Sequence, residues 1–200
     1  MAGHKLPLIP ASIISWADFK EANPNSLVLS RDTGFSRSYG SNPYVGYDRV
    51  DRPPFLRDGD QDDRLLPKER VVAIDIGDVS AAFSFPMLET ERVVNYPINR
   101  TDVVVFFKPG TVSALNKTLV VDLKDIGATG VFDPHLDGET LTFSLKDKNF
   151  VDDQMHNLEH LGRGAGRRDG RQIPNANRPW QPLLVRLGRV QPGYVDLSEN

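Results

Sequence analysis

Six short runs of β-branched and aromatic residues between Arg70 and Phe150 constrain the fold of this chain most strongly. Gly, Asp, Asn and Pro separate them, and these residues favour turns over continuous elements. The runs are VVAIDIGD, AAFSF, RVVNYPI, DVVVFFKPG, LVVDL and ETLTFSL. Short strands joined by turns favour antiparallel pairing. The expected fold class is therefore mainly β (α+β), an antiparallel β-rich domain in which helix is confined to short pieces.

The spacing of apolar residues indicates how these strands are buried. Every second residue is apolar in Val72–Ile76 and in Leu141–Leu145, which predicts strands with one face on the core and one toward solvent. VVVFF at 103–107 has no such alternation. We therefore expect it to be a central strand buried on both faces.

The N-terminal part of the chain predicts a helix, a turn and a strand. Ser15 can cap a helix that starts at Trp16, and Asn23-Pro24 stops it because a residue before proline avoids the α region. Trp16 and Phe19 are expected to hold this helix against the core, although a ligand platform is the alternative. Leu27–Leu29 is expected to be a short buried strand.

A long polar loop from Ser30 to Lys68 contains the candidate ligand-binding residues. Loops of this length in compact domains are usually functional or disordered. Its side chains could line a pocket, or its Arg–Asp pairs and Tyr hydroxyls could only tie down a wrapping loop. The acidic DGDQDD at 58–63 lacks the later Gly and terminal Glu of an EF-hand, which favours a solvated turn. The candidates are Arg31, Asp32, Arg37, Tyr44, Tyr47 and Asp48.

Composition excludes several classes of function. The 200 residues suit one ordinary domain, and the net charge of −3 predicts no strong attraction to nucleic acid or anionic membrane. No window approaches the roughly 20 apolar residues of a membrane span. MAGHKLPLIPAS lacks the apolar run of a secretory signal, so the localisation is not assigned. Because there is no cysteine, disulfides and thiolate chemistry are excluded.

Several strings resemble the bacterial and archaeal domain-of-unknown-function 3179 (DUF3179) family. They are LVLSRDTGFSRSYGSNPYVGYD, DDRLLPKERV, RVVAIDIGDVSAAFSFPM, RVVNYPI, VVVFFKPGTVSAL, FDPHLDGETLTFSL and FVDDQ. The resemblance covers about residues 3–154 and carries over no catalytic residue. It implies a longer protein with two related halves, a CPLCG-type motif in the first half, and export or lipoprotein signals in many relatives.

The resemblance also implies a division of this chain. Residues 1–30 resemble the end of a first repeat, 31–69 a polar linker, and 70–154 a β-rich second repeat. Under this interpretation the chain is truncated at its N-terminus. The missing first repeat would be its natural packing partner.

The tail after Met155 differs in composition, because it contains Arg but no Lys. His156–His160 fits the H-x-x-E-H pattern of zinc peptidases, and GRGAGRRDGR resembles a phosphate loop or an Arg-Gly segment. Neither is accepted as a site, since the zinc pattern has no third ligand. The family resemblance instead suggests that residues 155–200 are an out-of-frame, loosely ordered tail.

The genetic code allows this hypothesis to be examined on paper. When permitted codons are chosen for Asn175–Asp196 and read one nucleotide later, one available translation is TPIDHGSHYWFAWAAFNPDTW, continuing into I and Y. The string WFAWAAFNPDTWIY aligns without gaps to WADFKEANPNSLVL at 16–29. The tail would then encode, in another frame, a second helix–turn–strand. The nucleotide sequence around codons 150–160 distinguishes a shifted reading frame from an intact one.

Two functions are left open, beside a third interpretation in which this chain is a truncated, frame-shifted product with no function of its own. The first is a non-enzymatic binding or structural module, favoured because no catalytic, metal-ligating or cofactor-binding constellation is found. The second is an enzyme whose loop places Arg31, Asp32, Asp48 and Tyr47 around a small substrate. His135, in a turn sequence, is expected to be exposed rather than to act as a base.

Overall fold

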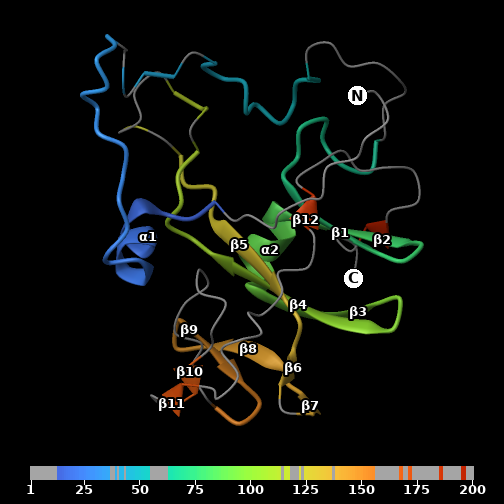
Figure 1. Ribbon diagram of the computed structural model, residues 1–200. Helices are drawn as coiled ribbons and strands as arrows, with labels where there is room; N and C mark the ends of the chain where they lie inside the picture. The colour runs from blue at the N-terminus through green and yellow to red at the C-terminus, as the bar shows by residue number, and fades with distance from the viewer. Residues whose placement is uncertain are drawn as a thin grey trace, which may run out of the picture.

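The computed structural model contains two short helices and a larger number of strands in the part of the chain that it describes (Figure 1). The mainly β class is therefore confirmed. The elements are α1 (Trp16–Ala22), β1 (Val71–Ile76), β2 (Val79–Ser84), α2 (Phe85–Glu91), β3 (Val93–Ile98), β4 (Thr101–Lys108), β5 (Ala128–Phe132), β6 (His135–Leu136), β7 (Glu139–Thr140), β8 (Phe143–Lys146), β9 (Asn149–Asp152), β10 (Arg167–Arg168), β11 (Arg171–Gln172), β12 (Val185–Arg186) and β13 (Val195–Asp196).

The structure describes most of the chain up to residue 155 and four short strands beyond it. The described residues are 13–36, 39, 41–42, 44–54, 63–113, 115–117, 122, 124–136, 138–155, 167–168, 171–172, 185–186 and 195–196. Candidate Arg37, most of DGDQDD, the zinc-like pattern at 156–160 and nearly all of the predicted LVVDL strand lie outside them.

Strand β4 is the centre of the fold. It pairs antiparallel with β3 and with β5 in a three-stranded sheet, while β1 and β2 form the middle of a second sheet in the order β12-β1-β2-β13. Every described strand pair is antiparallel except that of β13 with β2. The prediction of a central strand buried on both faces is confirmed, since residues 103–107 are at most 3% exposed.

The two faces of β4 belong to different apolar cores. Val103, Val105 and Phe107 join a core that includes residues of β1, β2 and α2. Val104 and Phe106 face the other way, into a core with residues of β5, β8 and β9. Phe106 contacts the Phe143 ring edge-on at 5.3 Å and the Phe150 ring at 5.0 Å. The central sheet is thus covered on both sides (Figure 1).

Strand β1 is more deeply buried than its alternation predicts. Val71–Ile74 are all buried, so the half-buried expectation is wrong for this strand. Val72 and Ile74 face the core shared with β4, whereas Val71 and Ala73 pack with Ala82 and the partly buried Leu65. The linker preceding β1 returns over the face that alternation alone assigns to solvent. The alternation at Leu141–Leu145 holds only in part, because Leu141 and Phe143 are buried and Leu145 is 39% exposed.

Helix α2 was not predicted from the sequence, although a local signal exists for it. Ser84 occupies the N-cap position and a proline falls in the first turn, a combination that favours helix starts. Leu88 of this helix is fully buried in the core. Because AAFSF has strong β propensity, the sequence pattern does not show where β2 ends and α2 begins.

Helix α1 is confirmed, but its expected packing is not. Ser15 caps it by accepting a hydrogen bond from the Asp18 N–H at 3.1 Å, and the helix ends before Asn23. Trp16 is 55% exposed and stacks on Phe19, while Ala22 is the buried residue of the helix. An ion pair of 2.6 Å between Asp18 and Lys108 connects α1 to the end of β4.

The buried strand expected at Leu27–Leu29 is absent. These residues form no described strand, and their exposed fractions are 97%, 63% and 85%. Burial of an apolar segment requires a surface to cover it, and no described residue of this chain supplies one.

The out-of-frame hypothesis for residues 155–200 stays a prediction, because only the backbone of β10–β13 is described there.

An asparagine side chain links the central sheet to the β8–β9 hairpin. Asn95 of β3 donates from Nδ2 to the Phe143 carbonyl at 2.8 Å and accepts from the Phe143 N–H at 2.9 Å. This pair of bonds imitates the exchange between two strands of a ladder. It therefore fixes the edge of β8 beside β3 without continuing the sheet.

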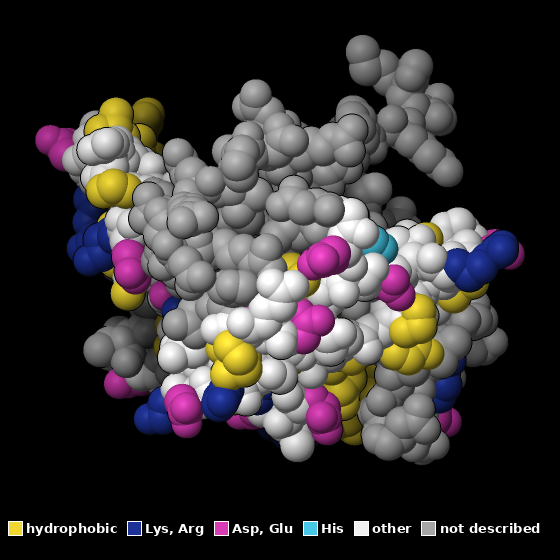
Figure 2. Space-filling view, turned by 90° about the horizontal axis from the view of Figure 1, so that it is seen from below, with side chains coloured by type: hydrophobic (Ala, Val, Ile, Leu, Met, Phe, Trp, Pro, Cys, Tyr) yellow, Lys and Arg dark blue, Asp and Glu magenta, His cyan; other side chains and the backbone are white. Residues whose placement is uncertain are grey.

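Charged side chains of both signs are interspersed on the face seen from below. Figure 2 shows Lys and Arg among Asp and Glu across this face, with apolar side chains between them. Among the residues described on this face, Lys and Arg form no continuous basic stripe of the kind that marks proteins that follow a nucleic-acid backbone.

The Asn95 contact predicts a specific loss of stability. Asn95→Asp keeps the shape but places a carboxylate oxygen against the Phe143 carbonyl, so the free energy of unfolding should fall by about 1–3 kcal/mol. Urea denaturation measures this change. The control is Asn149→Asp at an exposed position of β9, which should change stability by no more than about 0.5 kcal/mol. Equal effects of the two substitutions would contradict the role of Asn95.

Substitution of two glycines by alanine distinguishes the stability cost of backbone strain from the cost of steric overlap. Gly127 and Gly138 both have positive φ, +70° and +87°, but a Cβ at Gly127 would overlap the Phe107 ring, whereas nothing lies near one at Gly138. Gly138→Ala should cost about 1–2 kcal/mol from strain alone. Gly127→Ala should cost a further 1–3 kcal/mol or so, because Phe107 must move within a close-packed core. Thermal unfolding of both variants checks the difference.

Candidate functional site

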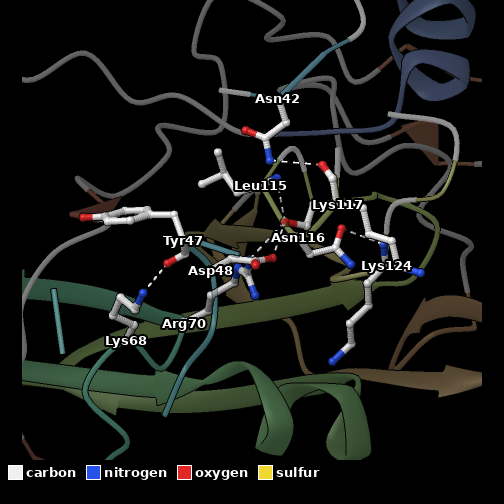
Figure 3. A network of polar contacts seen from close by, with 10 residues as sticks. Asn42, Tyr47, Asp48, Lys68, Arg70, Leu115, Asn116, Lys117 and Lys124 are labelled. Carbon is white, nitrogen blue, oxygen red and sulfur yellow. Dashed lines mark hydrogen bonds and ion pairs between the residues drawn. The ribbon is translucent and has the colours of Figure 1, made fainter. Parts of the chain in front are cut away.

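The polar loop is fastened to the segment 113–117 that follows β4 (Figure 3). The Gly46 N–H donates to the Leu115 carbonyl at 2.9 Å, and the Asn42 side chain donates to the Lys117 carbonyl at 3.1 Å. Asn42 is buried and also accepts from the Tyr44 N–H at 2.8 Å. The contacts with Leu115 and Lys117 join residues more than sixty positions apart, so the loop at 42–48 has a defined place on the domain.

Asp48 lies at the centre of a partly buried polar cluster. Its Oδ2 accepts from the Ser113 hydroxyl at 2.6 Å and from the Arg70 guanidinium at 3.3 Å. The Asp48 side chain is only 9% exposed, and Ser113 is 2% exposed. Arg70 also reaches the Ser113 oxygen at 3.4 Å, and the Leu115 N–H donates to that oxygen at 3.2 Å. A carboxylate at this depth is stabilised by such charge-assisted bonds.

Tyr47 and Tyr44 border this cluster on its solvent side. Lys68 donates from Nζ to the Tyr47 carbonyl and sits 4.5 Å from the centre of the Tyr47 ring. The rings of Tyr44 and Tyr47 are 6.4 Å apart and tilted. Tyr44 is 60% exposed and its neighbour Val45 is 54% exposed. The loop therefore holds a charged cluster inward and presents aromatic and apolar side chains outward.

The structure brings together only part of the predicted set. Asp48, Tyr47 and Tyr44 lie in one region, while Arg31 and Asp32 are exposed and have only local contacts among the described residues. The Asp32 N–H donates to the Ser30 hydroxyl at 3.1 Å, and the Arg31 carbonyl accepts from the Thr33 N–H at 3.2 Å. Arg37 lies outside the described residues.

Sequence reasoning missed the partners that complete the cluster. These are Asn42, Lys68, Arg70 and Ser113. In the sequence Arg70 only marks the start of the strand region, and Ser113 lies in a segment after Gly110-Thr111 that looks like ordinary loop. Their roles depend on which distant segment each one meets, and no local pattern records that.

An exposed ion pair flanks the cluster. Arg49 donates to both carboxylate oxygens of Asp51, at 3.2 and 2.7 Å. This hydrogen bonding lowers the pKa of Asp51 and raises that of Arg49. Both groups are in open solvent, where such pairs add little to stability. The pair orders the chain locally after Asp48.

His135, the first residue of β6, has two carboxylate neighbours. Its Nδ1 lies 2.5 Å from Asp133, and its Nε2 lies 3.7 Å from Asp102. The His135 side chain is 48% exposed, as expected, but the residue begins strand β6 instead of lying in a turn. No group of three or more His, Cys, Asp or Glu side chains within the described ranges is arranged to hold a metal ion.

The cluster around Asp48 is suited to anchoring rather than to proton transfer with a substrate. Ser113 donates its hydroxyl to a carboxylate, but it is buried, and no histidine in the described part of the chain accompanies the pair as a base. Arg70 neutralises the same carboxylate. The arrangement can hold two distant segments together and keep the exposed turn at 44–47 in one conformation.

Disruption of this cluster should reduce stability in a coupled way. Ser113→Ala removes the donor of a buried hydrogen bond, and Asp48→Asn removes the negative charge that Ser113 and Arg70 stabilise, so each should lower the free energy of unfolding by about 1–3 kcal/mol. The double variant should lose less than the sum, with a coupling of about 0.5–3 kcal/mol. Chemical denaturation of the four proteins measures this cycle.

The matched control is Asp32→Asn, which makes the same chemical change at an exposed position. It should alter stability by no more than about 0.5 kcal/mol. Additive effects of the first two substitutions would show that Asp48 and Ser113 do not act together.

Comparison with known proteins gives a family and nothing more specific. The model of a family described as "Protein of unknown function (DUF3179)" matches residues 1–167. No curated protein and no solved structure matches the chain. Among helices in the described part of the chain, none is long and apolar enough to cross a membrane.

Proposed function

Because the chain belongs to the DUF3179 family, whose function is unknown, we propose a function from the geometry of the loop: a non-enzymatic binding or structural module. In this proposal the domain is a rigid β scaffold, and the turn at residues 44–47 is the surface that meets another protein. The term tyrosine turn is used below for residues 44–47.

The burial of Asp48 is the observation that carries this proposal. Among the charged candidates that the structure describes, Asp48 has the largely buried side chain, and it is bonded to Ser113 and Arg70, so its charge is used within the protein. A carboxylate with such partners uses its hydrogen bonds to restrain the loop and not to bind a substrate. Gly46 and Asn42 restrain the same loop through backbone carbonyls of 115 and 117.

The tyrosine turn has the properties of a contact surface. Tyr44 and Val45 are more than half exposed although the backbone beneath them is hydrogen-bonded. Tyr is enriched at protein interfaces, because it supplies a large contact area with few rotatable bonds. A restrained turn also loses less conformational entropy when a partner binds.

The enzyme alternative would use Arg31, Asp32, Asp48 and Tyr47 around a small substrate. Within the part of the chain that the structure describes, Arg31 and Asp32 make only local contacts, and Asp48 is neutralised by Arg70. No observation therefore favours this alternative over the binding module. Unchanged stability of Asp48→Asn would revive it, since the carboxylate would then be free of a structural role.

Selection of binding peptides tests the proposal without a known partner. A displayed library of random peptides is selected against the wild-type protein, and the affinity of recovered peptides is then measured for Tyr44→Ala. We expect a loss of at least about tenfold, which corresponds to a hot-spot residue worth more than 1.4 kcal/mol. The melting temperature should be unchanged, because Tyr44 is largely exposed.

The control for this experiment is Tyr39→Ala. Tyr39 is also an exposed loop tyrosine, at 47%, but it lies outside the tyrosine turn. It should leave the affinities within about twofold of wild type. Peptides that bind Tyr44→Ala and wild type equally would contradict a binding role for the turn.

A further inference from the structure

The segment Ser26–Ser30 exposes apolar side chains that a folded chain normally covers. Leu27, Val28 and Leu29 have exposed fractions of 97%, 63% and 85%. Isolated exposed apolar residues are common, but three in succession at this level are not. Figure 1 shows the chain continuing from α1 along one side of the molecule, apart from the sheets.

The backbone of this segment is also available for pairing. Turns fix its two ends, since the Ser26 N–H donates to Asn23 and the Thr33 N–H donates to Arg31. Between them, the N–H and C=O groups of Leu27–Leu29 have no hydrogen bond to any residue that the structure describes. Unpaired backbone with Val and Leu side chains is the template on which another strand adds.

The sequence of the segment identifies the strand that fits it. Ser26-Leu27-Val28-Leu29-Ser30 reads the same in both directions. In antiparallel pairing about a two-fold axis each residue meets a partner whose number is fixed by symmetry, so a palindrome matches every residue with its own type. We propose that this segment pairs antiparallel with the same segment of a second copy of the chain.

The pairing places complementary groups opposite one another. With the axis at Val28, that residue meets Val28 of the second copy, while Leu27 meets Leu29 and Ser26 meets Ser30. Side chains alternate along a strand, so the four leucines share one face of the pair and the two valines share the other. Aliphatic cross-strand pairs of this kind stabilise antiparallel strands.

Charge does not oppose the pairing. The segment contains no charged residue, and the first charge beyond it, Arg31, would face Asn25 of the second copy. Like charges directly opposite would be destabilising, and this register has none. The inference is independent of the tyrosine turn, which lies in another part of the chain.

Position 28 provides the test, because its side chain meets its own copy at the axis. Sedimentation of the full chain from about 10 μM to about 1 mM should show a concentration-dependent dimer, a range that covers weak association. Val28→Lys and Val28→Asp each place like charges together and should weaken dimerisation by at least about tenfold. An equimolar mixture of the two variants should restore a dimer that contains one copy of each.

Val112→Lys is the matched control, since it adds the same charge at an exposed valine outside both the segment and the tyrosine turn, 48% exposed against 63%. It should leave the dimer unchanged, and circular dichroism should show the same fold for all variants. A monomer throughout the concentration range would overturn the proposal, because another occupant must then cover the segment. A dimer that persists in Val28→Lys, or a mixture that fails to associate, would overturn it as well.

Discussion

The burial of β4 on both faces is the constraint on which the rest of the structure depends. Residues 103–107 alternate between a core shared with β1, β2 and α2 and a core shared with β5, β8 and β9. A strand without a solvent face requires a layer on each side. The β1–β2 hairpin and the β8–β9 hairpin supply these layers, and Asn95 fixes the second one beside β3.

The position of the polar loop follows from the same strand. The chain leaves β4 at Lys108 and continues into the segment 111–117, which provides the Ser113 hydroxyl and the carbonyls that hold Asn42 and Gly46. Arg70 enters the cluster immediately before β1. The ends of two core strands therefore define the site of Asp48. Hydrogen bonds from Gly46 and Asn42 to the segment after β4 hold the exposed turn at 44–47 in place.

Local signals predicted much of this fold correctly. The Ser15 cap and the Asn23-Pro24 stop delimit α1, and the unbroken apolar run at 103–107 identifies β4. They failed where burial depends on another segment. Alternation in β1 indicates one buried face, but the partly buried Leu65 of the preceding linker packs against the other face, where Ala82 of β2 lies beside Ala73. Leu27–Leu29 looks like a buried strand, yet no described part of the chain packs on it.

The sequence by itself determined the β-rich class, the central strand, the first helix and the family resemblance, because propensity, periodicity and capping act over a few neighbouring residues. Only the tertiary structure decided which loop residues form a cluster. Asp48 and Tyr47 are adjacent in sequence, but their partners Ser113 and Lys68 lie 65 and 21 positions away. Contacts at such separations depend on how the sheets pack, and no local pattern in the chain encodes that packing.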